Sequence, residues 1–223
     1  MNAESLPAIE LEIGPRPVFS VIWMHGLGAD GNDFVPVVGE LGLDGVPVRF
    51  VFPHAPMRPV TINGGYVMRA WYDITYEDLS LKEDEKGVRE SQEAVERLIA
   101  REVSRGVAPD HVLLAGFSQG GAIALQTGLR HAHRLGGILA LSTYLPLPES
   151  IEQERSDANR NVPILMAHGT EDPIVPLKLA QASCSRLLTL GYPVEWHEYA
   201  MPHSVCEEEI EDIGRWLRAR TQR

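Results

Sequence analysis

The sequence predicts an α/β fold, in which a mostly parallel central sheet carries helices on both faces. Two observations lead to this expectation. Six short apolar runs, each of strand length, alternate with segments of helical pattern along the chain. Four of these runs are almost continuously apolar, which is typical of parallel strands buried on both sides of a sheet.

The predicted elements follow one another in a regular order. The strand candidates lie at 18–24, 48–52, 111–117, 136–142, 162–168 and 193–199, and the helix candidates near 34–41, 84–105, 119–131, 176–190 and 206–220. The last helix is the clearest, because its apolar residues from Ile210 to Leu217 recur on one face. Ser204 and Glu207 form an S-x-x-E pattern, so we expect a capping box at its start.

One long segment, 53–83, contains no clear helix or strand pattern. Such a long irregular stretch inside a compact fold is usually functional. We therefore expect a single domain over residues 1–223, with an excursion at 53–83 near the functional site. The remaining sequence leaves little room for a large lid domain.

Composition narrows the classes of partner. The chain has 223 residues and a formal charge of −11, which argues against nucleic acid or an anionic membrane as partner. Cys184 and Cys206 are not in a C-x-x-C or other metal-ligand spacing, so we expect plain thiols in a reducing compartment. No signal peptide or 20-residue apolar run is visible, and we expect a cytoplasmic protein without stable membrane insertion.

The stretch HGLGADG follows the first predicted strand and contains Gly26, Gly28 and Gly31 in a G-x-G-x-x-G pattern. A dinucleotide-binding site also needs an acidic residue at the end of the second strand, about 20 residues on. Here Asp44 precedes that strand, and Pro36 fits poorly into the helix that should follow the glycines. We therefore reject the dinucleotide interpretation and expect this loop to present backbone N–H groups to another anion.

A second motif, GFSQGG, gives a candidate nucleophile. Ser118 stands in a G-x-S-x-G pattern, directly after an apolar strand candidate and directly before a helix candidate. This strand–turn–helix setting is that of a nucleophile elbow, which holds a serine in a strained conformation. The alternative is a glycine-rich turn with an incidental serine, but the flanking elements favour the nucleophile.

A serine nucleophile needs a general base, and the base needs a group that orients it. His203 lies between the last strand and the last helix, at the sheet edge where open α/β sheets place their sites. After the preceding strand come Glu171 and Asp172; we prefer Asp172, because a short carboxylate before a proline is easier to hold rigid, but Glu171 stays open.

The other histidines after the serine fit structural roles. His131 and His133 end the helix after the elbow, where we expect them to cap it or to face solvent. His197 lies within a strand, so its ring should pack on a face of the sheet. We expect His168 to order the loop that carries the carboxylate candidates.

Taken together, HGLGADG, PHAP, WYD at 71–73, GFSQGG, HGTEDPIVP and MPHS resemble the phospholipase/carboxylesterase family of α/β-hydrolases, which includes acyl-protein thioesterases. The motifs occur in order from residue 25 to residue 204. The resemblance implies an α/β-hydrolase fold and a catalytic triad of Ser118, Asp172 and His203. It also implies an oxyanion hole formed by the backbone N–H groups of Leu27 and Gln119.

The resemblance further implies the substrate class. We expect hydrolysis of short- to medium-chain acyl esters, or of thioesters or lysophospholipids, by a monomer or homodimer that needs no metal or cofactor. Trp71, Tyr72 and Met68, with Val67, offer apolar surface for an acyl pocket, although the two aromatic residues could instead only pin the excursion to the core. A peptidase or lactonase on the same fold, or a non-catalytic ligand-binding module, are the alternatives.

Overall fold

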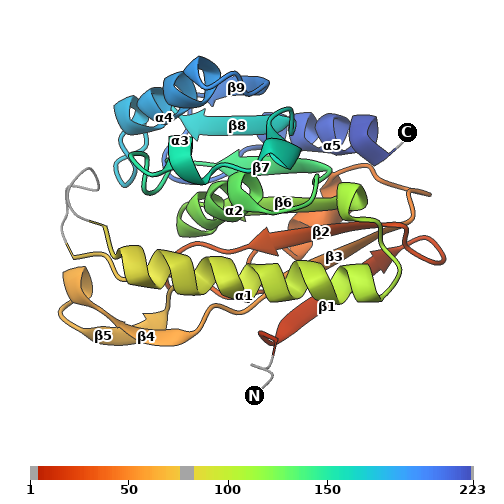
Figure 1. The fold of residues 1–223 in the computed structure, drawn as a ribbon, viewed down its shortest axis with the longest axis horizontal. Coiled ribbons are helices and arrows are strands. Elements are labelled where there is room, and N and C mark those ends of the chain that lie inside the picture. The colour runs from red at the N-terminus through yellow and green to blue at the C-terminus, as the bar shows by residue number, and fades with distance from the viewer. Residues whose placement is uncertain (1–4, 76–82, 222–223) are drawn as a thin grey trace.

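A computed structural model describes residues 5–75 and 83–221 and places a seven-stranded sheet at its centre (Figure 1). The strand order is β1-β3-β2-β6-β7-β8-β9, and β1 pairs with β3 in antiparallel register while the other neighbours are parallel. The strands are β1 Ala8–Ile13, β2 Phe19–Met24, β3 Val48–Pro53, β6 Val112–Phe117, β7 Gly137–Leu141, β8 Ile164–Gly169 and β9 Val194–Tyr199. The mostly parallel sheet that the sequence predicts is confirmed.

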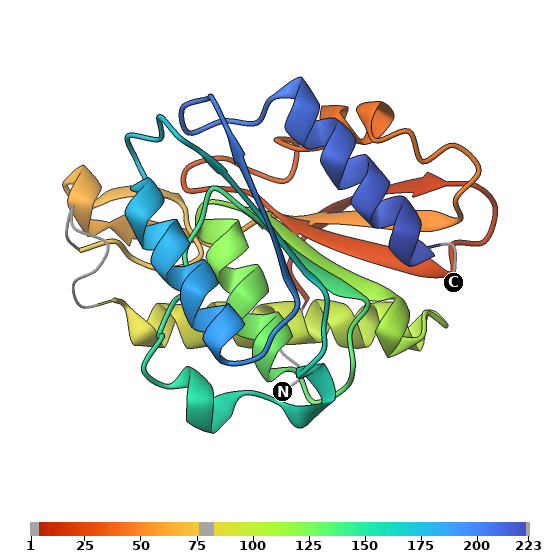
Figure 2. The same ribbon diagram turned by 90° about the horizontal axis from the view of Figure 1, so that it is seen from above.

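Helices cover both faces of this sheet (Figure 2). The α-helices are α1 Glu85–Ser104, α2 Gln119–Arg130, α3 Ile151–Glu154, α4 Leu177–Thr189 and α5 Glu207–Thr221. The 3-10 helices are η1 Pro36–Glu40, η2 Thr61–Asn63, η3 Pro109–His111 and η4 Asp157–Asn159. One face carries α1, α2 and α4, and the opposite face carries α5 together with η1. Among the residues described, no separate lid domain stands over the sheet.

Side chains that point alternately to the two faces of the sheet form two hydrophobic cores, one on each face. In β2, Ile22 faces the layer of α1 and α2, where it packs with residues such as Leu98 and Leu114. Its neighbour Trp23 faces the other layer and packs with residues such as Phe50. Successive strand residues point to opposite faces, so a strand that is apolar throughout can fill both layers.

Some local predictions were wrong. The predicted helix at 34–41 is the short 3-10 helix η1, because Pro36 restricts its first turn and no longer helix follows. The capping box of Ser204 and Glu207 does not form, because α5 begins at Glu207 and leaves Ser204 two residues before the cap position. In addition, β1 was not expected; its sequence AIELEI alternates apolar and acidic residues and forms an edge strand.

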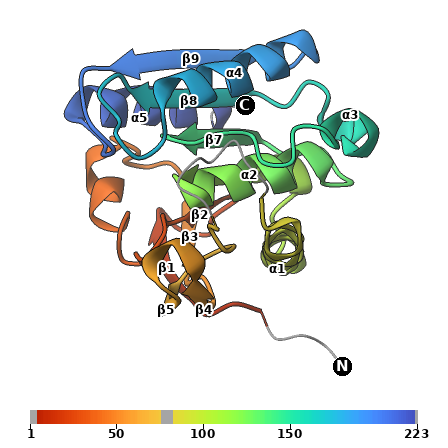
Figure 3. The same ribbon diagram turned by 90° about the vertical axis from the view of Figure 1, so that its left-hand side faces the viewer.

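The excursion at 53–83 contains an unexpected hairpin of β4 Met57–Val60 and β5 Tyr66–Arg69 (Figure 3). It lies outside the central sheet, as a two-stranded sheet of its own. Residues 76–82 of the predicted excursion lie outside the described part of the chain. In the part that is described, no helix has the length and apolarity needed to cross a membrane.

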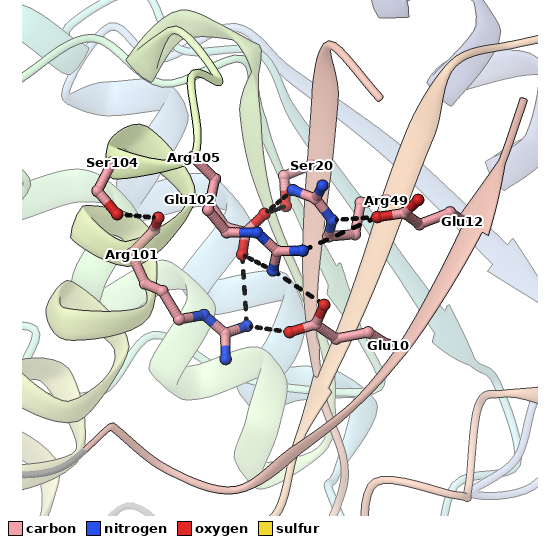
Figure 4. Close-up of polar contacts among 8 residues, drawn as sticks. All are labelled: Glu10, Glu12, Ser20, Arg49, Arg101, Glu102, Ser104 and Arg105. Atoms are coloured by element: carbon pink, nitrogen blue, oxygen red, sulfur yellow. Dashed lines mark hydrogen bonds and ion pairs between the residues drawn. The ribbon is translucent and has the colours of Figure 1, made fainter. Parts of the chain in front are cut away.

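A charged network joins β1 and β3 to the C-terminal end of α1 (Figure 4). Glu102, which is completely buried, accepts hydrogen bonds from Arg49 Nη1 at 2.8 Å, Ser20 Oγ at 3.1 Å and Arg105 Nη1 at 3.1 Å. Arg105 Nη1 also pairs with Glu10 of β1 at 2.9 Å. Both oxygens of the buried carboxylate are therefore paired, and the edge strand is tied to the helix.

Candidate active site

The turn between β6 and α2 holds Ser118 in a strained conformation, with φ 54° and ψ −121°. Two glycines make this turn possible. A Cβ at Gly116 would lie 2.2 Å from the backbone of Gly120, and a Cβ at Gly120 would lie 2.2 Å from the carbonyl oxygen of Met24. The chain segments approach too closely for any other residue, as a nucleophile elbow requires.

The neighbouring strand β7 fixes this turn from the side. Ser118 N–H donates to the carbonyl oxygen of Leu141 at 2.9 Å, and the carbonyl oxygen of Ser118 accepts from Thr143 Oγ1 at 2.7 Å. The strained backbone is thus held by hydrogen bonds on both sides of the serine. Such over-determination is what allows a strained residue to persist at a functional site.

The predicted base and orienter lie in contact. His203 Nδ1 is 2.6 Å from Asp172 Oδ2, and the Asp172 side chain is completely buried. The other oxygen, Oδ1, accepts from the N–H groups of Ile174 and Val175 at 2.8 and 2.9 Å. Three hydrogen bonds therefore fix this carboxylate, whereas Glu171 is exposed to solvent. Of the two carboxylates left open by the sequence, the geometry favours Asp172 as the partner of His203.

His203 lies beside the elbow. Its ring centroid is 4.7 Å from that of Phe117, the residue before Ser118. No hydrogen bond joins Ser118 Oγ to His203 in the described part of the chain. Contacts between a nucleophile and its base are often long in unliganded structures and tighten when substrate binds. The structure thus brings the three predicted residues to one edge of the sheet, where the carboxyl ends of β6, β8 and β9 meet.

His168 orders the loop that carries Asp172, as the sequence predicts. Its Nε2–H donates to the carbonyl oxygen of Val175 at 2.9 Å and lies 3.5 Å from Asp172 Oδ2. Burial lowers the pKa of His168, which outweighs the raising effects of the Val175 carbonyl and Asp172. A neutral His168 closes the loop between residues 168 and 175 without adding a charge beside the Asp172–His203 pair.

The HGLG loop is pinned by His25. His25 Nε2 accepts from Ala55 N–H at 3.0 Å, so the proton is on Nδ1, which donates to the carbonyl oxygen of Gly26 at 2.7 Å. Burial lowers the pKa of His25, consistent with a neutral ring. Gly28, with φ 77°, donates its N–H to the carbonyl oxygen of Arg69 at 2.9 Å and so attaches the loop to β5.

Two backbone donors, one in the HGLG loop and one at the start of α2, remain unpaired among the described residues. In residues 5–75 and 83–221, no acceptor is bonded to the N–H of Leu27 or of Gln119. Gln119 is the first residue of α2, where backbone N–H groups have no partner within the helix and the helix dipole favours negative charge. Both predicted donors are thus free to bind an oxyanion.

The side chain of Gln119 has a role that sequence reasoning missed. It is buried, its Oε1 accepts from Trp71 N–H at 3.0 Å, and its Nε2 donates to the carbonyl oxygen of Tyr72 at 2.7 Å. Trp71 Nε1 in turn donates to the carbonyl oxygen of His25 at 2.8 Å. One side chain therefore attaches the 71–72 segment to the elbow; the sequence carries no signal for this contact.

A cavity of about 430 Å³ opens beside the serine. Its walls are formed by Leu27, Ile62, Asn63, Tyr72, Ile74, Ser118, Gln119, Tyr144, Pro173, Ile174 and Val175. We call it the Ser118 cavity. Most of its wall residues are apolar, and they come from the HGLG loop, the excursion, the elbow and the segments after β7 and β8.

Of the predicted pocket residues, the structure places Tyr72 on the cavity wall but not Trp71 or Met68. Trp71 is completely buried and both of its N–H groups are bonded to protein, so it pins the excursion to the core. Met68 contacts Asn63 through its sulfur, 3.4 Å from Nδ2, and Val67 is half exposed on the hairpin. The pinning alternative holds for Trp71.

Tyr144 is a wall residue that the sequence analysis did not name. It follows the fourth predicted strand by two residues, and the carboxyl ends of parallel strands are where such sites form. That rule applied to the predicted strand at 136–142 would have found it.

The remaining histidines lie away from this site. His131, at the end of α2, is buried and pairs with Glu96 at 2.5 Å, while His133 is exposed. His197 lies on β9 and pairs with Glu195 and Asp212. Of the five histidines that follow Ser118, only His203 therefore lies beside the elbow among the described residues, and His168 supports it by ordering the Asp172 loop.

Comparison with known proteins gives consistent matches. The model of the phospholipase/carboxylesterase family matches residues 14–221. Acyl-protein thioesterase 1 of Cryptococcus neoformans var. neoformans serotype D is 37% identical, over 93% of this chain and 95% of the relative. Acyl-protein thioesterase 1 of Gibberella zeae is 39% identical, over 89% of each chain. The crystal structure of Arabidopsis thaliana SOBER1 superimposes with a TM-score of 0.86 at 32% identity, over 91% of this chain and 98% of that one.

Proposed function

This chain belongs to the phospholipase/carboxylesterase family and is a serine hydrolase, and from that premise we propose that it cleaves short- to medium-chain acyl esters or thioesters through Ser118, His203 and Asp172. The observation that carries the proposal is the 2.6 Å contact of His203 Nδ1 with a buried Asp172, placed next to a strained serine. A merely structural histidine would not need this arrangement at the carboxyl edge of three strands.

In the acylation step, Ser118 Oγ attacks the acyl carbonyl carbon while His203 Nε2 takes the hydroxyl proton. The carbonyl π electrons move to oxygen and form a tetrahedral oxyanion. Asp172 Oδ2 holds His203 Nδ1–H and stabilises the imidazolium that results. The Asp172 carboxylate is itself held by the N–H groups of Ile174 and Val175, so it needs little reorganisation during the step.

In this proposal, the anion that binds to the N–H groups of the HGLG loop is the oxyanion of the tetrahedral intermediate. The unpaired N–H groups of Leu27 and Gln119 would donate to it, and each such donor commonly contributes a factor of about 10²–10³ in rate. His25 and Gly28 fix the loop on either side of Leu27, through Ala55, Gly26 and Arg69. The donors are therefore in place before negative charge develops.

Collapse of the intermediate breaks the bond to the leaving group, which receives the proton from His203. A water then attacks the acyl–Ser118 ester, His203 accepts its proton, and a second collapse releases the carboxylic acid and restores Ser118. Every proton removed by His203 is returned in the same half-reaction, so the residues named supply the whole cycle.

The Ser118 cavity supports the proposed size of the acyl group. At about 430 Å³ it lies toward the lower end of small-molecule sites, which commonly have volumes of about 300–1,000 Å³. Leu27, Ile74 and Val175 give it apolar walls for an alkyl chain. Because the relatives are named acyl-protein thioesterases, we include thioesters of acylated proteins among the proposed substrates. Lysophospholipids are included as well, because they also carry an acyl group that the same attack would release.

Fluorophosphonate labelling followed by peptide mapping tests the proposal. An activated serine should give one adduct per chain, on Ser118, and Ser118→Ala protein should not react. A panel of p-nitrophenyl esters and acyl thioesters of increasing chain length then identifies the preferred acyl group. If wild-type protein neither reacts with the probe nor hydrolyses any ester, the site is a ligand-binding module and the proposed activity is wrong.

A further inference from the structure

Two tyrosines from distant segments meet in the wall of the Ser118 cavity. The hydroxyl groups of Tyr72 and Tyr144 are 2.8 Å apart, and the two residues are only 2% and 5% exposed. Tyr72 belongs to the excursion and Tyr144 follows β7. A polar pair therefore stands among walls that are otherwise mainly apolar.

Each tyrosine is positioned by a contact to the elbow. The carbonyl oxygen of Tyr72 accepts from the side chain of Gln119, the residue after the serine, at 2.7 Å. Thr143, the residue before Tyr144, donates to the carbonyl oxygen of Ser118 at 2.7 Å. The position of the hydroxyl pair relative to Ser118 is thus set from both sides.

The backbone is strained to deliver Tyr144. Ser142 is completely buried and has φ 46°, a left-handed conformation that is uncommon for a residue other than glycine. β7 ends at the residue before it, Leu141, and the N–H of Ser142 donates to the carbonyl oxygen of Ala167 at 2.8 Å. Strained residues cluster where a site is being shaped, and Ser118 shows the same feature one strand away.

The pair has one hydrogen-bond donor too many. Two hydroxyls carry two donors, and the contact between them uses one. Within the described residues no further acceptor is bonded to either phenol oxygen. The nearby Glu83 uses Oε2 for the N–H of Leu147, and its Oε1 has no partner in the part of the chain described. Burial raises the pKa of both tyrosines, so both keep their protons at any working pH.

We propose that this Tyr72–Tyr144 hydroxyl pair determines acyl specificity: it favours acyl groups that carry an acceptor oxygen within the chain over all-carbon chains of the same length. The inference rests on the proposed function of the Ser118 site. A chain oxygen would accept the remaining hydroxyl proton, whereas an alkyl chain would displace water from that donor and leave it unsatisfied. Sites that hydrogen-bond a substrate discriminate strongly for this reason.

Phenylalanine variants isolate the effect. Either single variant, Tyr72→Phe or Tyr144→Phe, still has one free hydroxyl donor, although its direction is no longer fixed by a partner. The double variant has none. Because both partners are replaced by apolar groups of nearly the same shape, the double variant should fold with little change in stability.

The experiment compares isosteric esters: p-nitrophenyl hexanoate, 4-methoxybutanoate and 3-ethoxypropanoate, in which an ether oxygen replaces one methylene at two different depths. For wild-type protein and the three variants, the ratio of kcat/KM for each ether ester to that for hexanoate is measured. This ratio cancels any general loss of activity. In the double variant it should fall by about three- to tenfold for at least one ether position, as loss of one hydrogen bond predicts.

Ratios that stay unchanged at both ether positions, or a double variant that loses activity equally on all three esters, would overturn the proposal and leave the pair a structural contact. A binding arm separates this from failure of the proposed activity. The methyl esters of the same acids are titrated into Ser118→Ala protein, with and without the double substitution, by ligand-observed NMR. Preferential binding of an ether ester that disappears with the hydroxyls would support the selectivity even if no ester is turned over.

Discussion

Glu102 and Glu209 are both completely buried, near opposite ends of the parallel strands. They differ in whether the carboxyl group is paired, and therefore in the direction of the pKa shift. Burial alone would raise the pKa of Glu102, but hydrogen bonds from Arg49 and Ser20 and the charges of Arg49 and Arg105 outweigh it and lower the pKa (Figure 4). Glu209, the third residue of α5, has no side-chain hydrogen-bond partner for either oxygen among the described residues, and burial raises its pKa to about 8 despite the lowering effect of the Cys206 backbone.

The amino and carboxyl ends of the parallel strands differ in the same way. At the amino ends of β2 and β3, Ser20 and Arg49 belong to a network in which the buried charge is paired. At the carboxyl ends, the backbone is strained at Ser118 and Ser142, and donors remain unpaired around the cavity. One edge therefore stabilises the fold, while the other holds polar groups ready for a ligand at some cost in stability.

The largest expected effect sharpens this division. Ser118→Ala should lower kcat on a good ester by about 10⁶-fold, as removal of a nucleophile that acts with its base does. The free energy of unfolding should change little, because Ser118 Oγ makes no hydrogen bond to another described residue, whereas the backbone bonds that hold the turn are kept. Steady-state kinetics and urea unfolding measure the two quantities. Retention of a tenth of the wild-type activity would show that the elbow is not catalytic.

The next effect separates the two carboxylates. Asp172→Asn should reduce kcat by about 10⁴-fold, because an amide cannot hold His203 in its working tautomer or stabilise its charge. Glu171→Gln, the matched control on an exposed neighbour, should stay within about twofold of wild type, as surface substitutions usually have small effects. Kinetics at saturating ester decide the matter. A larger loss in the Glu171 variant would transfer the orienting role to that residue.

At the opposite edge the expected effect is on stability. Glu102→Gln should lower the free energy of unfolding by about 3–5 kcal/mol, because it removes the buried carboxylate charge that pairs with Arg49 and leaves that arginine only the half-exposed Glu12. Since the folded pKa of Glu102 is lowered, its contribution is present above the unfolded pKa and is lost as pH falls. Glu12→Gln, in which a half-exposed partner of Arg49 is altered, should cost less than about 1 kcal/mol.

Urea unfolding at neutral pH measures both variants, and kcat of the Glu102 variant should remain close to that of wild type. If the Glu102 variant lost activity without losing stability, the separation of the two edges would be wrong.

The smallest effect depends on pH. The pKa of Glu209 is about 8 in the folded chain and near its ordinary 4.5 when unfolded, so between these values the folded state holds a proton that the unfolded state has lost. Glu209 therefore makes the fold less stable as pH rises through this window. Glu209→Gln should raise the free energy of unfolding at pH 9, relative to its effect at pH 5, by on the order of 2 kcal/mol.

The exposed neighbour Glu208 provides the control. Glu208→Gln should shift the stability equally at the two pH values, as measured by urea unfolding in matched buffers. A Glu209 variant with the same pH dependence as wild type would mean that this carboxyl finds a partner and that the two buried glutamates do not differ.

Much of the fold follows from the sequence because buried parallel strands are apolar throughout. All six predicted strands are present, and four helices lie within two residues of their expected bounds. The alternating edge strand β1 and the short hairpin were missed, since neither has a continuous apolar run. A single domain, a cytoplasmic location and a monomer or homodimer stay predictions.

The candidate site was predictable where a motif or a position after a strand marked it. Ser118, His203 and Asp172 each follow a predicted strand, and the structure brings them together. Contacts that depend on tertiary packing were not predictable. Neither the clamp by the Gln119 side chain nor the meeting of Tyr72 with Tyr144 leaves a local pattern, because their partners lie 47 and 72 residues away in the chain.

The antiparallel strand β1 has a consequence for behaviour at high protein concentration. It pairs with β3, whose apolar sequence VRFVF would otherwise form an open edge able to add strands from other molecules. Its exposed acids pair with arginines of the same chain: Glu10 with Arg101 and Arg105, and Glu12 with Arg49. Charged residues on an edge strand hinder pairing with strands of other molecules, so we expect β1 to protect the sheet against aggregation.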